Sequence, residues 1–315
     1  MRLRAFSFRR AAATMALATV ALLAAACSST SASNADAVHG GAIVAVGAEN
    51  EYASVIGQIG GKYTQVTAIL SNPNTDPHTF EASPSVAELV SSAQLVVQNG
   101  VGYDSFMNKI EAASPDPGRA VIDVQKLLGL PDSTPNPHLW YSPRTMPAVA
   151  RAVAARLSAL QPAHKAYFAS RLAAFMTSLK PWAAAIAHFR AVYPGTAMAV
   201  TEPVADYMLQ AAGARILTPF SFQADIMNGV DPSPQAVAEQ DSLFTDHKVK
   251  VFLYNRQVTD TLTQSFLKAA ARYGVPVVGV YETMPVPGYT YQSWMLAEVR
   301  ALQKAVAGKI STQKL

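Results

Sequence analysis

Residues 163–192 read AHKAYFASRLAAFMTSLKPWAAAIAHFRAV, and this stretch divides the chain into two halves. Its large apolar residues recur at alternating steps of four and three, which places them on one face of a helix and which no strand could use. They are Phe168, Leu172, Phe175, Leu179, Trp182, Ile186 and Phe189. A helix of this length would extend roughly 45 Å at about 1.5 Å per residue, enough to cross two lobes. Because Pro181 removes a helical hydrogen bond, we expect a kink there or two abutting helices.

Short β-rich runs alternate with helical patterns on both sides of this stretch, which is typical of an α/β protein with mainly parallel sheets. Four candidate strands precede it, at residues 43–47, 65–70, 95–99 and 120–123, and four follow it, at 196–201, 215–218, 250–255 and 276–281. The sequence therefore predicts two similar lobes, each a mainly parallel sheet flanked by helices. We place them at residues 41–160 and 195–315, joined by one long backbone helix within 161–194. A single packed connector favours small lobe motions over wide closure.

The distribution of charge argues against a nucleic-acid-binding surface. The 315-residue chain has 25 Lys+Arg and 21 Asp+Glu, but four of the arginines and none of the acids lie in the first 26 residues. The remainder carries equal numbers of basic and acidic side chains, so no broad phosphate-binding surface is expected on it. With half of its residues hydrophobic and a single cysteine, the chain is expected to fold around a large core without disulfide bonds.

The N-terminus has the pattern of an export signal. An arginine-containing segment is followed by the uncharged run from Ala11 to Ala26, which is too short for an ordinary membrane span. The lone Cys27 directly follows Ala26, in a setting that resembles the lipobox of bacterial lipoproteins. We therefore predict a signal peptide at residues 1–26, lipid attachment at Cys27 and a flexible tether at 27–40. The alternative is an ordinary signal peptide with an incidental cysteine.

Two histidines lie in similar loops, each preceded by proline and followed by a helix start. His78 lies in the run DPHTF, ahead of Ser83-Pro84, and His138 lies in NPHLW, ahead of Ser142-Pro143. Serine followed by proline is a favourable start for a helix, as it also is at Ser233-Pro234. Loops beyond the carboxyl ends of parallel strands commonly bind ligands. The other four histidines, His39, His164, His188 and His247, lack this setting and are interpreted as surface or helix residues.

Two acids occupy comparable positions in the second half of the chain. Glu202 directly follows the strand predicted at 196–201 and precedes a helix predicted at 203–212, while Glu282 directly follows the strand predicted at 276–281. Taken alone, Glu202 could be a helix N-terminal acid favoured by the helix dipole, and Glu282 a solvated loop acid.

Together these motifs resemble the metal-binding lipoproteins of bacterial ABC importers for manganese and zinc. The resemblance covers essentially the whole mature chain and is most specific in DPHTFEASPS at residues 76–85; NPHLW, the Glu202-x4-Tyr207-x5-Gly213 spacing and Asp231-Pro-Ser-Pro234 add to it. It implies one metal ion held between the lobes by His78, His138 and Glu202. The fourth ligand that it implies is usually Asp; here Glu282 is the nearest candidate, with a water or Asn255 as substitutes. Four aromatic residues could form an apolar shell around the ion or simply pack in the core: Phe80, Trp140, Tyr207 and Trp294.

The function implied is that of a carrier rather than an enzyme. Such a protein would be exported, lipid-anchored to the outer face of the membrane, expected to be monomeric, and would pass Mn²⁺ or Zn²⁺ to a permease driven by a cytoplasmic ATPase. Two imidazoles and two carboxylates do not by themselves choose between the two metals. One alternative is an exported metal-dependent hydrolase with two histidines, one carboxylate and a bound water. A second alternative is an adhesin-like surface lipoprotein.

Overall fold

A computed structural model describes residues 41–74, 76–285 and 287–315, and these belong to one compact unit. The predicted signal peptide, the Cys27 lipid attachment and the tether lie outside the described residues. No helix within these described ranges combines the length and the apolar character needed to span a membrane.

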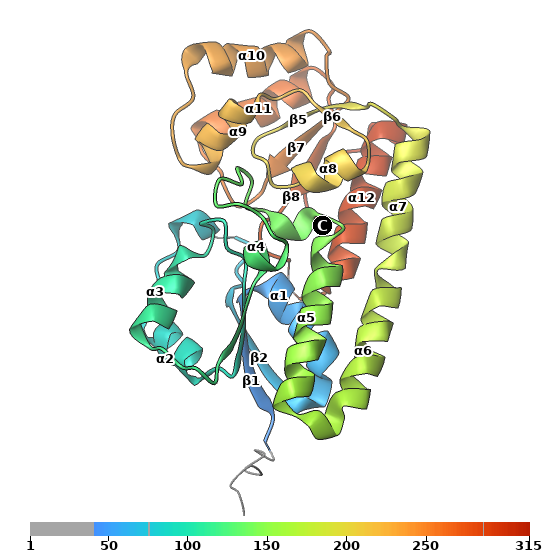
Figure 1. Ribbon diagram of the computed structural model, residues 1–315. Helices are drawn as coiled ribbons and strands as arrows, with labels where there is room; N and C mark the ends of the chain where they lie inside the picture. Colours follow the sequence, from blue (N-terminus) through green and yellow to red (C-terminus); the bar gives the residue numbers. More distant parts are fainter. Residues whose placement is uncertain (1–40, 75, 286) are drawn as a thin grey trace, which may run out of the picture. The chain divides into compact units, whose positions relative to one another are not determined.

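The first sheet contains four parallel strands in the order β2-β1-β3-β4. They are β1 (Ile43–Glu49), β2 (Thr64–Leu70), β3 (Leu95–Gln98) and β4 (Ala120–Asp123). Figure 1 shows its strands β1 and β2 side by side. The helices of this region are α1 (Asn50–Gly60), α2 (Pro84–Ser92), α3 (Ser105–Ala113), α4 (Val124–Leu127) and α5 (Thr145–Leu160), with short 3₁₀ turns η1 (Gly61–Tyr63), η2 (Pro77–Thr79) and η3 (Leu139–Tyr141). All four strands predicted for this half are confirmed.

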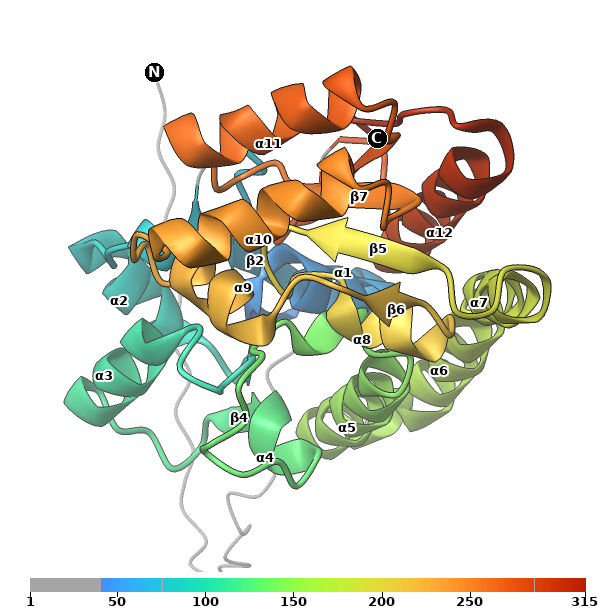
Figure 2. The same ribbon diagram turned by 90° about the horizontal axis from the view of Figure 1, so that it is seen from above.

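The second sheet repeats the first in its topology, with parallel strands in the order β6-β5-β7-β8. They are β5 (Ala197–Val200), β6 (Arg215–Ile216), β7 (Val251–Asn255) and β8 (Val277–Val280). The helices are α8 (Asp206–Ala211), α9 (Phe220–Met227), α10 (Pro234–Thr245), α11 (Thr261–Arg272) and α12 (Tyr291–Gly308), several of which surround this sheet in Figure 2. The prediction of two similar lobes with mainly parallel sheets is confirmed.

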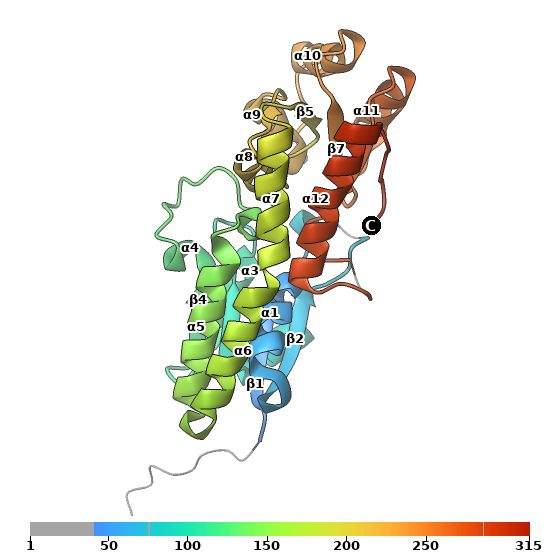
Figure 3. The same cartoon turned by 90° about the vertical axis from the view of Figure 1, so that its right-hand side faces the viewer.

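The connector consists of η4 (Pro162–His164), α6 (Lys165–Ser178) and α7 (Lys180–Val192), which abut at Leu179. The break falls where Pro181 occupies the first turn of α7, a position at which its missing N–H costs no hydrogen bond. Of the two outcomes expected at Pro181, two abutting helices is therefore the correct one. Figure 3 shows α6 and α7 end to end, with α12 beside α7; α6 also packs against α5.

Both faces of the sheets are covered, as parallel sheets require. In β7, Val251 and Leu253 point into the main core, whereas Phe252 and Tyr254 point into a second cluster with α9, α10 and α11. The main core includes residues of both sheets and the apolar face of the connector. Its buried members from α6 and α7 were all selected by the periodicity, whereas Leu172 is only partly buried.

Two predicted helix starts are wrong. The helix after Ser142-Pro143 begins only at Thr145, without a side-chain cap, because the residues before it form the tight turn η3 that carries the loop of His138. The helix predicted at 203–212 is the shorter α8, so Glu202 lies in a loop rather than at a helix N-terminus. Ser83 and Ser233 do cap α2 and α10 as predicted.

Candidate metal site

The loop of His78 is ordered by its neighbour in the sequence. The Asp76 carboxylate accepts a hydrogen bond of 2.8 Å from the His78 backbone N–H, and Pro77 occupies the first position of η2. This cap fixes the turn that directs the imidazole towards the second lobe. The His78 side chain keeps 22% of its exposure, whereas the side chains of His138 and Glu282 are fully buried.

The loop of His138 is held by Asn136, which also sets the protonation of the imidazole. The Asn136 Oδ1 atom accepts hydrogen bonds from the His138 backbone N–H at 3.0 Å and from His138 Nδ1 at 2.8 Å. An amide oxygen can only accept, so Nδ1 carries a proton. In the neutral ring, Nε2 then presents a lone pair, the state in which a histidine binds a metal.

Glu282 follows β8 and is fixed through its backbone. The N–H groups of Glu282 and Thr283 donate to the same atom, Gln257 Oε1, at 2.7 and 2.8 Å. Gln257 therefore fixes the backbone just beyond the carboxyl end of β8, from which the Glu282 side chain reaches the two histidines of the first lobe.

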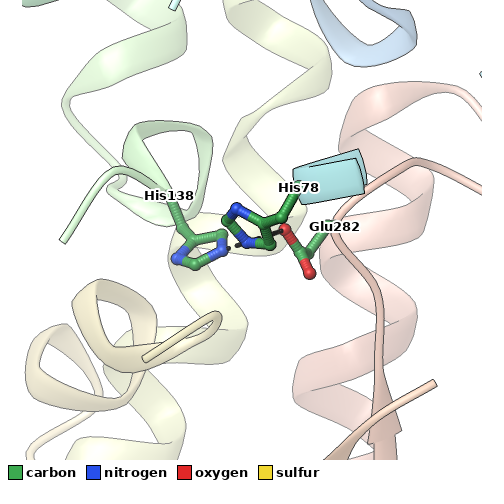
Figure 4. A group of neighbouring side chains, drawn as sticks. All are labelled: His78, His138 and Glu282. Carbon is green, nitrogen blue, oxygen red and sulfur yellow. Dashed lines mark hydrogen bonds and ion pairs between the residues drawn. The ribbon is translucent and has the colours of Figure 1, made fainter. Parts of the chain in front are cut away.

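The two histidines and Glu282 converge on one point, as Figure 4 shows. Glu282 Oε2 lies 3.1 Å from His78 Nε2 and 3.2 Å from His138 Nε2. One ligand-type atom from each residue lies within 4.8 Å of the others, and this is the metal-type cluster found among the described residues. Ligands about 2.1 Å from one ion in tetrahedral geometry lie roughly 3.4 Å apart, so each of the two distances between Glu282 Oε2 and an imidazole nitrogen would widen by only a few tenths of an ångström around an ion.

The protonation of the three groups is mutually dependent. Burial alone would raise the pKa of Glu282, but its contacts with His138 and His78 outweigh burial and lower that pKa. Burial lowers the pKa of His138 below its usual value, only partly offset by Glu282. At His78 burial also lowers the pKa, yet the hydrogen bond and charge of Glu282 prevail and raise it. The carboxylate thus faces one imidazole that is readily protonated and one that favours its neutral form.

Glu202 lies beside this cluster but outside it. The Asn255 amide donates to Glu202 Oε1 at 3.1 Å and to Glu282 Oε1 at 2.7 Å, so it bridges the two carboxylates. Glu202 Oε2 is buried and accepts no hydrogen bond from the described residues. Burial, and then the charge of Glu282, raises the pKa of Glu202 well above its usual range, which favours a neutral carboxyl group.

Asn255, the predicted substitute ligand, is turned away from such a role. Its Nδ2 atom faces the two carboxylates, while its Oδ1 atom accepts a 3.0 Å hydrogen bond from the Gln257 backbone N–H. The oxygen that would bind a metal is therefore engaged elsewhere.

Tyr103 contacts the cluster and was not predicted. Its hydroxyl donates to Glu282 Oε2 at 3.0 Å. The tyrosine is brought there by the turn at residues 100–102, where Gly100, Val101 and Gly102 all adopt positive φ and the Asp104 carboxylate accepts from the backbone N–H groups of Asn99 and Gly100. The two glycines signal a turn in the sequence, but nothing in it signals that the following side chain reaches the other lobe.

The four aromatic residues considered for the apolar shell lie at different distances from the cluster. Trp140 packs edge-on against His138, with ring centroids 5.4 Å apart, and Tyr207 donates to the Asn136 carbonyl at 2.8 Å. Phe80 packs against Phe106, and Trp294 donates to Glu298. Trp140 thus borders the candidate site directly, Tyr207 supports the loop of His138, and Trp294 belongs to the surrounding core.

Two α/β lobes that supply side chains to one buried point define a two-lobed binding protein, the class in which a small solute is held where the lobes meet. The chain belongs to the family described as zinc-uptake complex component A, periplasmic, whose family model matches residues 46–305.

Individual relatives have similar sequences or folds. The high-affinity zinc uptake system protein ZnuA of Haemophilus ducreyi is 24% identical over 235 residues, which cover 65% of this chain and 74% of the relative. The solute-binding protein FpvC of Pseudomonas aeruginosa, solved with Mn²⁺, has a TM-score of 0.69 at 19% identity, covering 85% of this chain and 99% of FpvC. The periplasmic zinc-binding protein TroA of Treponema pallidum has a TM-score of 0.68 at 17% identity, covering 82% and 99%.

Proposed function

We propose that this protein captures one divalent transition-metal ion, Mn²⁺ or Zn²⁺, and delivers it to the membrane permease of an ABC importer. His78, His138 and Glu282 would be ligands, with Glu202 as the fourth. Family membership supports the transport role, and the similarity to FpvC and ZnuA supports the choice of these two ions.

The observation that carries this proposal is the placement of the His138 lone pair. Because Nδ1 donates to Asn136, the lone pair of neutral His138 lies on Nε2 and faces Glu282 Oε2 at 3.2 Å. Two electron-rich atoms at this distance repel each other unless a cation lies between them. A proton can supply that charge, but a metal ion would satisfy both atoms together with His78.

Glu202 would complete the coordination through its Oε2 atom, while Oε1 keeps its hydrogen bond from Asn255. Its unpartnered Oε2 atom is a buried acceptor without a donor, an arrangement that costs free energy. A metal ion would supply the missing partner, and the raised pKa of Glu202 implies that a proton leaves as the ion enters. Two nitrogens and two oxygens suit both candidate ions.

Delivery would occur outside the cytoplasm, with the protein held to the membrane by lipid on Cys27. The export pattern of residues 1–26 and the cysteine that follows support this arrangement. The carrier role is favoured over a hydrolase because two of the three clustered side chains have no exposure, which suits an ion better than an organic substrate.

The test is metal uptake by the mature chain, measured by elemental analysis after gel filtration and by competition with a chelator. We expect about one equivalent of Mn²⁺ or Zn²⁺ in the parent protein. His138→Ala and Glu282→Gln should lose affinity by a hundredfold or more, whereas the exposed controls His188→Ala and Glu88→Gln should match the parent. Parent-like binding by His78→Ala and His138→Ala together would overturn the proposal.

A further inference from the structure

A buried tyrosine hydroxyl connects the two loops that carry His138 and Glu282. Tyr141 ends the η3 turn, three residues after His138. Its hydroxyl oxygen lies 2.8 Å from the carbonyl oxygen of Tyr281, the residue before Glu282, and 2.8 Å from Glu298 Oε1 on α12. Tyr141 and Glu298 have no solvent exposure, so water cannot replace these contacts.

The number of protons available between Tyr141 and its two oxygen neighbours determines the protonation state of Glu298. Tyr141 has one hydroxyl proton but two oxygens at 2.8 Å, and the Trp294 indole N–H, which can only donate, also contacts Glu298 Oε1 at 2.8 Å. Both contacts of Tyr141 are hydrogen bonds only if Glu298 carries a proton and donates it to the tyrosine oxygen. The Tyr281 backbone N–H, 3.4 Å from the Tyr141 oxygen, can only donate to it and does not supply the missing proton between Tyr141 and Glu298.

The surroundings of Glu298 agree with this state. Among the described residues no lysine, arginine or histidine forms an ion pair with Glu298. The ionisable groups that sense its charge are Tyr141, Tyr281 and Tyr291, while the buried residues of the neighbouring α7 and β8 are apolar. Of the charged groups that act on these tyrosines, Glu51 of α1 acts on Tyr141 and Tyr291, and Arg256 acts on Tyr281. Burial raises the pKa of Glu298 to about 8, with Tyr141, Trp294 and the Tyr281 backbone opposing the shift.

We propose that Tyr141 and Glu298 are positioning residues for the metal site: uncharged Glu298 donates to Tyr141, and Tyr141 donates to the Tyr281 carbonyl. These two hydrogen bonds hold the loop of His138 against the loop of Glu282. They thereby keep the proposed ligands of the two lobes in position relative to each other. The inference rests on the proposed function, since it assigns these residues a role in metal binding. When Glu298 loses its proton at alkaline pH, it becomes an acceptor for the Tyr141 proton, and the bond to Tyr281 is lost.

The proton on Glu298 is tested without metal. The infrared spectrum at pH 6 should contain the carbonyl band of a buried carboxylic acid that Glu298→Gln removes. Because the folded-state pKa is about 8 and the unfolded value about 4.3, the parent loses stability as pH rises between these values. Glutamine does not titrate, so the Tm of Glu298→Gln minus that of the parent should increase from pH 5 to pH 8. A constant difference, or a spectrum without the band, would overturn the proton assignment.

The positioning role is tested by chelator competition with Zn²⁺ between pH 7 and pH 9. A hydrogen bond has a net value of about 1 kcal/mol, so the parent's affinity divided by that of Glu298→Gln should fall about threefold to tenfold over this range. When Tyr141→Phe is added to both the parent and Glu298→Gln, the ratio of their affinities should stay constant between pH 7 and pH 9. Tyr254→Phe is the matched control, because it removes a buried hydroxyl whose partner, Gln264, lies in the same lobe.

The possible outcomes separate the two proposals. If the parent's metal affinity divided by that of Glu298→Gln does not change with pH, the positioning role is overturned while metal binding is left intact. Should Tyr141→Phe fail to fold, the pH profile of Glu298→Gln against the parent still decides. If neither the parent nor any variant binds metal, the proposed function is rejected, and the positioning role with it. The infrared and Tm results would still decide whether Glu298 carries a proton.

Discussion

Asn136 shows how one side chain can prepare a ligand for metal binding. It holds the backbone N–H of His138, fixes the proton on Nδ1, and donates from its own amide to the Pro203 carbonyl of the second lobe at 2.7 Å. Groups that orient a metal-binding histidine through its second nitrogen typically change affinity by 10- to 100-fold. The NPHLW motif therefore places a proposed ligand and its orienting residue two positions apart.

We predict that Asn136→Ala lowers metal affinity by about 10- to 100-fold while the stoichiometry stays at one ion. The lone pair of His138 would no longer be directed to Nε2 by a fixed partner. Isothermal titration calorimetry with Zn²⁺ measures both quantities. Asn228→Ala, which removes a single hydrogen bond at the exposed C-terminal end of α9, is the control and should be unchanged. Equal affinities for the two variants would contradict the orienting role.

At the scale of elements, β8 is placed by the chain that follows α12. Thr312 forms a parallel bridge with Val278, and the Gly279 N–H donates to the Thr312 carbonyl at 2.9 Å. A Cβ atom at Gly279 would lie 2.3 Å from the Gln313 carbonyl oxygen, so only glycine permits this approach. Because Glu282 lies just beyond β8, the C-terminal segment helps to position the candidate site.

We predict that Gly279→Ala destabilises the protein by about 1–3 kcal/mol, since the backbone of the C-terminal segment must shift. Thermal unfolding followed by circular dichroism measures the change. Gly57→Ala is the matched control: it lies in α1 with no atom within 4 Å of the added Cβ, and alanine is the better helix former. A Tm for Gly279→Ala equal to that of the parent would show that the segment is not held against β8.

The sequence predicts elements better than it predicts contacts between them. All eight strands follow from alternating β-rich runs, and the connector follows from its apolar periodicity, because these signals are local. The fourth-ligand position is different: Glu202 and Glu282 have similar sequence contexts, yet only Glu282 meets the histidines. That distinction depends on tertiary contacts: Gln257 fixes the backbone of Glu282, and the Asn255 amide bridges the two carboxylates. Tyr103 was missed for the same reason.

For the molecule as a whole, the candidate site depends on contacts that hold the two lobes together. Tyr291 of α12 donates to the Trp140 carbonyl at 2.6 Å, and the Asn50 side chain pairs with both the N–H and the carbonyl of Met284. Together with the connector and the shared core, these contacts support the expectation that the lobes move little on metal loading, which stays a prediction. In such a rigid arrangement, metal binding would require only small shifts of the proposed ligand side chains.

Anomalous diffraction from crystals of the mature chain loaded with Zn²⁺ is the most direct test of the central claim, that ligands from both lobes share one ion. The account predicts one strong peak, about 2.0–2.2 Å from Nε2 of His78, Nε2 of His138 and a carboxylate oxygen of Glu282. A peak bound by residues of one lobe only, or one that leaves Glu282 paired with the histidines as in Figure 4, would contradict it.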